Sequence, residues 1–205
     1  TSLSWGNIDA RNVQLKAHTQ ADSLLLNGSI LAHQPYPVAI NFTSSMQFPN
    51  GDEFVANIEK LKGKIGKATI ANSHDIIFKY NQNESLFKLH DFKVGDGLLD
   101  TTMRLKDNNI QASIKLTNIP TNALPNILPA SAGNASINGT SNLSGNIATP
   151  YLETNFEVQN ISLGAKEAKP LTMQISSIIN TNSSNFNIAV DLAGKNVSTI
   201  SAKLP

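Results

Sequence analysis

The chain has 205 residues, no cysteine, only 15% charged residues and a formal net charge of +1 at pH 7. This balance gives no basic field for a nucleic acid, and the lack of cysteine excludes disulfides and thiol chemistry. Asn, Ser and Thr take the polar positions that Lys and Glu would fill on helices, which favours strands joined by short turns. We therefore expect an all-β protein.

Apolar residues recur at every second position along most of the chain, as in strands with one apolar face. Short turn sequences rich in Asn, Asp and Gly separate these runs at residues 49–52, 81–83, 95–97, 107–109 and 180–182. The side chains predicted to share the apolar face are Leu24, Leu26, Ile30, Ile76, Phe78, Tyr80, Phe87, Leu89, Leu99, Met103, Leu105, Ile110, Ile114, Leu116, Leu152, Phe156, Val158, Leu171, Met173, Ile175, Phe186, Ile188, Val190 and Leu192.

Three places depart from simple alternation. The apolar phase slips at His90 and Asp91, which predicts a bulge or a strand end. Residues 54–61 fit both helical and strand spacing, and we favour a strand. Residues 121–128 form the better helix candidate, limited by Pro125 to about one turn or a 3₁₀ turn. The stretch 129–133 is loop-like, but it has too few linker features to mark a domain boundary. We therefore expect residues 1–205 to form one elongated unit.

The sequence offers no constellation for catalysis. No serine lies in a nucleophile elbow, and the Gly and Lys residues at 63–68 lack the spacing of a phosphate loop. The His residues have no metal-binding spacing, so we predict no metal site. His74-Asp75 and His90-Asp91 are the only His–carboxylate neighbours; adjacent strand residues point to opposite faces, so we expect neither pair to share a proton. We therefore predict that the chain is not an enzyme and needs no cofactor.

Residues 54–105 and 110–162 resemble the repeated unit of the TamB (translocation and assembly module) family and the wider AsmA-like group. The resemblance lies in the alternating strands, Gly139, the Leu143-Ser144-Gly145 step, and Pro150 followed by Leu152. It implies a β-taco, an elongated U-shaped antiparallel sheet with an apolar interior groove and at most one or two short helical turns. The chain would then be an internal piece of a longer protein.

The same resemblance implies a place and a role. Members of the family are anchored in the inner membrane of Gram-negative bacteria, cross the periplasm and work with a BamA-type outer-membrane barrel, TamA. They are linked to phospholipid transfer and to outer-membrane protein assembly, so the expected ligands are phospholipid acyl chains. The alternation alone also fits a closed and dry core, as in a structural β-solenoid or adhesin stalk. A hydrolase on a β scaffold is a third and weak alternative, because we find no nucleophile–base pair.

Overall fold

The computed structural model describes residues 3–5, 8–34, 37–123, 135–162 and 171–204. In this part of the chain, 15 strands form one sheet in which all pairs are antiparallel. The elements are β1 (Leu3–Trp5), β2 (Ile8–Gln20), β3 (Ser23–Gln34), β4 (Val38–Gln47), β5 (Phe54–Ile65), β6 (Ala68–Ala71), β7 (Ile76–Tyr80), β8 (Glu84–Val94), β9 (Gly97–Lys106), β10 (Asn109–Pro120), the 3₁₀ helix η1 (Thr121–Ala123), β11 (Ser136–Asn146), β12 (Thr149–Ile161), β13 (Leu171–Asn180), β14 (Ser183–Leu192) and β15 (Lys195–Leu204).

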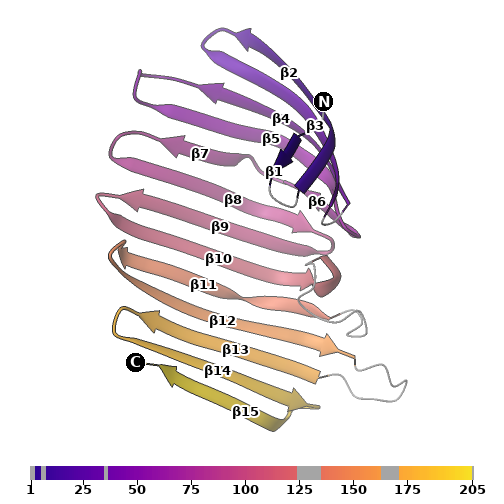
Figure 1. The fold of residues 1–205 in the computed structure, drawn as a ribbon, viewed down its shortest axis with the longest axis vertical. Coiled ribbons are helices and arrows are strands. Elements are labelled where there is room, and N and C mark those ends of the chain that lie inside the picture. The colour runs from indigo at the N-terminus through magenta and orange to yellow at the C-terminus, as the bar shows by residue number, and fades with distance from the viewer. Residues whose placement is uncertain (1–2, 6–7, 35–36, 124–134, 163–170, 205) are drawn as a thin grey trace.

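The strands follow one another through the sheet almost in chain order, as a long meander (Figure 1). The one interruption is at β6 and β7, which pair with the two halves of β5 and together act as one broken strand. The all-β prediction is confirmed, as is the strand over residues 54–61, which begins β5. The predicted turn after residue 120 is η1. Residues 124–128 and the whole of the loop 129–133 lie outside the described part.

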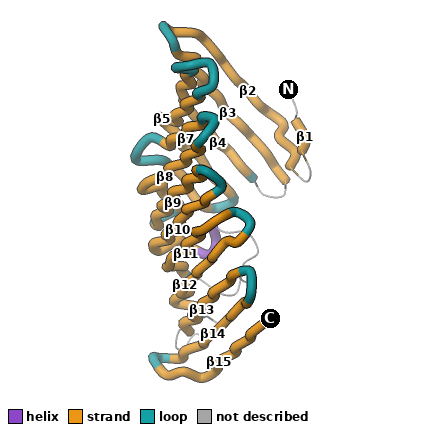
Figure 2. The backbone as a smooth tube through the Cα atoms, turned by 90° about the vertical axis from the view of Figure 1, so that its left-hand side faces the viewer, coloured by secondary structure: helices purple, strands orange, loops and turns teal. Residues whose placement is uncertain are grey.

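The sheet is curved. Seen from its side, the first strands and the last strand bend toward the same side, so that the sheet forms a trough (Figure 2). The predicted elongated, U-shaped antiparallel sheet is therefore present. Strands in a sheet normally twist, and a stronger local bend requires bulges that lengthen one strand relative to its neighbour.

Such bulges occur in every second strand in the middle of the sheet. The register shifts between Leu89 and Phe92 in β8, between Leu116 and Ile119 in β10, and between Val158 and Ile161 in β12. In each case two residues of the bulged strand oppose one residue of its neighbour, and the second of the two has a positive φ: 48° at Asp91, 51° at Asn118 and 58° at Asn160. Asp and Asn tolerate this left-handed conformation better than other residues with side chains. The bulge predicted at His90 and Asp91 is confirmed.

The neighbouring strand caps two of these bulges with a side chain. The Asp91 N–H donates to Oδ1 of Asp100 in β9 at 2.9 Å. The Asn118 N–H donates to Oδ1 of Asn138 in β11 at 2.8 Å. A bulge leaves a backbone donor without its ladder partner, so each cap satisfies the group that the bulge releases. The same device thus appears twice along the sheet, once with a carboxylate and once with an amide.

The bulge in β8 also corrects one expectation from the sequence. We expected His90 and Asp91 to point to opposite faces, but Nε2 of His90 lies 3.4 Å from Oδ2 of Asp91. The alternation of faces holds only for regular strand residues, and the left-handed backbone at Asp91 breaks it. Residues near one another in sequence therefore meet on one side of the sheet here.

Burial is confined to one face. Every buried strand residue in the described ranges lies on the same side as Phe78 and Met103, and the largest group is the cluster of Ile119, Ala135, Ile137, Val158 and Ile161. Ile119 is 2% exposed. Next to this cluster, the backbone N–H and the hydroxyl of Thr121 both donate to the Ala135 carbonyl, at 2.9 and 3.1 Å. A curved sheet buries its inner side more, so this side is the interior of the trough.

Candidate functional site

The pairing register places all the side chains predicted to share a face on one face of the sheet. One row across the strands illustrates this: Phe78 faces Phe87, which faces Met103, and the row continues through Leu143 and Leu152. Directly paired residues have their side chains on the same side, so a row of this kind is a continuous apolar strip. We call this side of the sheet the apolar face.

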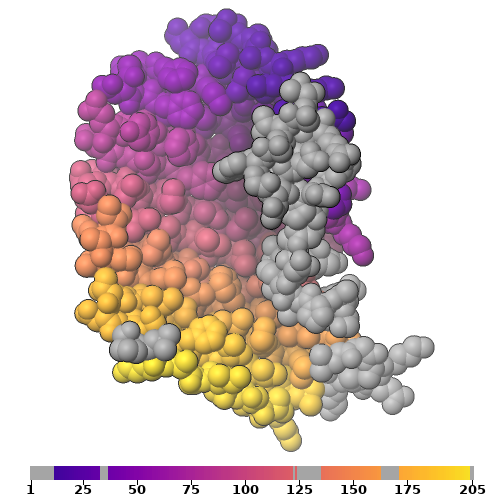
Figure 3. All heavy atoms as spheres, viewed as in Figure 1, coloured from indigo at the N-terminus to yellow at the C-terminus, as the bar shows by residue number. Residues whose placement is uncertain are grey.

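The apolar face is partly open. Large apolar side chains on it remain accessible to solvent, including Tyr80 at 49%, Ile114 at 40%, Phe186 at 41% and Ile200 at 62%. Figure 3 looks into the concave side and shows a hollow in the middle of the molecule. Contiguous exposed apolar surface is uncommon on proteins that act alone in water, and it marks a place where another apolar surface binds.

Another part of the apolar face is closed. Val158 is 3% exposed and Ile76 is 7% exposed, so these two predicted groove residues belong to the core. Phe156, Leu171 and Met173 pack against the Ile119 cluster and are only half-buried. The sequence analysis missed Ile119 and Ile161 because each follows a bulge that shifts the period of two. Only knowledge of the bulge positions would have identified them.

Two glycines on the apolar face make room for aromatic rings from the next strand. A Cβ on Gly28 would lie 2.4 Å from Cζ of Phe42, and one on Gly139 would lie 2.6 Å from Cδ1 of Phe156. Gly139 also has a φ of 144°, which side chains disfavour. Each ring therefore lies over the bare backbone of its neighbour and keeps the floor of the trough apolar where no side chain is present.

The opposite side of the sheet is mainly polar. Lys79, Arg104 and Lys115 alternate with the apolar residues and are exposed. Nε of Arg104 lies 2.5 Å from Oε1 of Glu84 on the adjacent strand. An exposed ion pair of this kind contributes little to stability, about 0–1 kcal/mol, but its charged groups keep this face hydrophilic. The two faces of the sheet thus differ in character: one is mainly apolar and the other is mainly polar.

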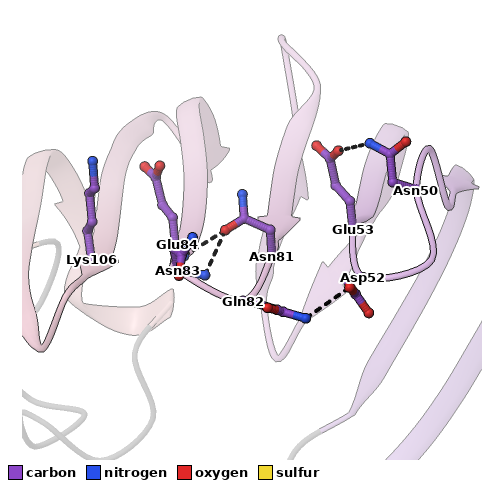
Figure 4. A pocket seen from close by; sticks show the side chains of 8 residues that line it. All are labelled: Asn50, Asp52, Glu53, Asn81, Gln82, Asn83, Glu84 and Lys106. Carbon is purple, nitrogen blue, oxygen red and sulfur yellow. Dashed lines mark hydrogen bonds between the residues drawn. The ribbon is translucent and has the colours of Figure 1, made fainter.

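A polar hollow lies where the turns after β4 and β7 meet the end of β9 (Figure 4). Nε2 of Gln82 donates to Oδ2 of Asp52 at 2.9 Å, and Nδ2 of Asn50 donates to Oε2 of Glu53 at 3.3 Å. The polar groups of this hollow are thus largely paired with one another. They tie adjacent turns together, and they do not converge on a common point where a reacting atom could sit.

No family model, curated protein or solved structure matches the chain. Among the described residues, no helix has the length and apolar character needed to cross a membrane.

Proposed function

We propose that the apolar face binds phospholipid acyl chains and guides them along the trough. The chain would be a periplasmic segment of a TamB-like protein of a Gram-negative bacterium, whose full length is anchored in the inner membrane. It would serve phospholipid transfer between the membranes, assembly of outer-membrane proteins, or both. The full-length protein would act with the BamA-type barrel TamA. The observation that supports this proposal is the continuous and partly exposed apolar face of an otherwise polar sheet.

The energetics favour this ligand class. A phospholipid in water exposes about 30 methylenes, each worth about 0.8 kcal/mol, or roughly 25 kcal/mol in total. A carrier must cover that surface without a gap but needs no strong polar contact, which would hold the lipid in place. The exposed side chains on the apolar face come from strands as far apart as β7, β10, β14 and β15. At about 4.8 Å between strands, the sheet offers a path roughly 60 Å long.

Photo-crosslinking on the two faces tests the proposal. A crosslinking residue at Phe78, Met103, Ile114, Phe156 or Ile188 should label co-purified lipid, whereas one at Lys79, Arg104 or Lys115 should not. Ile114 and Lys115 form a matched pair, because they are neighbours in β10 and point to opposite faces. Val158 is a further control on the apolar face, since it is buried and should remain unlabelled.

Native mass spectrometry of the chain purified from bacterial cells is the companion measurement, and it should detect bound phospholipid. The alternative function, a structural stalk with a closed dry core, predicts no bound lipid and no labelling at any of these positions. Equal labelling on the two faces would also contradict a lipid groove, because it would mean that the protein is coated with lipid without regard to face.

A further inference from the structure

A cluster of His and Asp side chains lies at the bulge of β8, on the side of the sheet opposite the apolar face. It joins His90 and Asp91 of the bulge to His74, which precedes β7. The ring centroids of His74 and His90 are 5.1 Å apart although the residues are 16 positions apart in the chain. The sequence analysis found no metal-binding spacing among the His residues, because this contact is made only by the pairing of the strands.

The side chain of Asn72 helps to hold the loop that carries His74 in place. Oδ1 of Asn72 accepts a hydrogen bond from the Leu61 N–H at 2.6 Å. Its Nδ2 donates to the carbonyls of Ile58 at 3.1 Å and His74 at 2.9 Å. Asn72 therefore fills the gap between β6 and β7 and fixes the backbone of His74 beside the bulge. A fixed position of this kind is what a ligand of a binding site requires.

The separations between the candidate ligand atoms fit a coordination sphere. Oδ2 of Asp91 lies 3.6 Å from Nδ1 of His74 and 3.4 Å from Nε2 of His90. Bonds of about 2.0–2.1 Å in a tetrahedral zinc site place neighbouring ligand atoms about 3.3–3.4 Å apart. One ligand atom from each of the three residues lies within 4.8 Å of the other two. Small side-chain rotations would bring them to these separations.

The other nitrogen of His90 has the partner that metal-bound imidazoles usually have. Nδ1 of His90 lies 2.5 Å from Oδ1 of Asp100, the carboxylate that also caps the Asp91 N–H. With Nδ1 of His90 held by this carboxylate, the other ring nitrogen, Nε2, lies on the side of Asp91, which is the arrangement of carboxylate–histidine–zinc sites.

The bulge itself does not require these residues. The corresponding bulges in β10 and β12 have Asn118 and Asn160 at the left-handed position, and Thr117 and Gln159 precede them. An Asn therefore meets the backbone requirement that Asp91 meets. The His and Asp side chains at the bulge of β8 are therefore not needed for its backbone conformation.

We propose that His74, His90 and Asp91 bind a divalent transition-metal cation of the zinc class, with Asp100 as the positioning residue for His90. The side chains of His74 and His90 are 58% and 67% exposed, so a metal could enter from solvent and keep water at its remaining position. The bound metal would link the interrupted strand to the bulge of β8 and stabilise the curve of the sheet. The site is on the opposite face from the proposed lipid groove and does not depend on it.

Titration of the chelator-treated full chain with Zn²⁺, in competition with a chromophoric chelator, tests the site. We expect one zinc per chain and a higher melting temperature with zinc. The variants His90→Gln and Asp91→Asn should weaken binding by more than tenfold, and Asp100→Asn by about 10–100-fold. Asp91→Asn is the decisive variant for folding, because Asn occupies the same position in the other bulges.

The matched control is His18→Gln, an exposed histidine of β2 outside the cluster, which should bind zinc as the unmodified chain does. Co²⁺ in place of Zn²⁺ should give visible absorption bands that change in His74→Gln and stay unchanged in His18→Gln. The proposal is overturned if the unmodified chain binds no stoichiometric zinc. It is equally overturned if His90→Gln and Asp91→Asn retain full affinity while circular dichroism shows an intact sheet.

Discussion

A charge placed on the open part of the apolar face should separate the proposed lipid binding from folding. Ile114 in β10 is 40% exposed, and burying a whole isoleucine is worth about 1.5–3 kcal/mol. Ile114→Glu therefore removes roughly 1–2 kcal/mol of stability, which a domain of about 5–15 kcal/mol survives. An unpaired carboxylate against an acyl chain costs more than this, several kcal/mol, because it finds neither water nor a partner. We expect the bound lipid to fall by at least tenfold.

The assay is native mass spectrometry for lipid per chain, with thermal unfolding followed by circular dichroism on the same samples. Ser113→Glu is the control, because Ser113 adjoins Ile114, is exposed and points to the polar face. Val158→Glu should instead unfold the chain, since Val158 is 3% exposed. The reasoning is refuted if Ile114→Glu keeps its lipid, or if Ser113→Glu loses as much.

Further predictions concern the devices that shape the trough. Gly139→Ala should lower the free energy of unfolding by about 1–3 kcal/mol in denaturant titrations, because its Cβ would lie 2.2 Å from the Asn155 carbonyl oxygen and would also overlap Phe156. Gly51→Ala, which has open space around the new Cβ, should change it little. Asn72→Ala should cost about 2–4 kcal/mol and speed hydrogen exchange at the Leu61 amide, since it removes the bonds that close the gap between β6 and β7; unchanged exchange would contradict this role. Asn160→Ala should destabilise by about 1 kcal/mol while Asn160→Gly should not, and equal effects would mean that its φ of 58° is not what matters.

The sequence by itself determined the two faces of the sheet. Alternation is a local property of a strand, and the side of each apolar residue follows from its position in the run. All the side chains predicted to share a face, from Leu24 to Leu192, accordingly do so. The turns rich in Asn and Asp were predictable for the same reason, because Asn108 and Asp107 adopt the positive φ that tight turns require. The bulge of β8 was predictable too, because the alternation of apolar residues shifts by one position at His90 and Asp91.

Only the tertiary structure decided what lies beside what. Whether an apolar residue is accessible, as Ile114 is, or buried, as Val158 is, depends on the curvature of the whole sheet. That curvature comes with bulges, and those at Asn118 and Asn160 were not predicted from the sequence. The meeting of His74 with His90 has the same origin, since it requires both the break between β6 and β7 and the bulge of β8. The alternation of apolar residues along a strand shows which face of the sheet each side chain lies on. It does not show which residues of other strands lie next to that side chain.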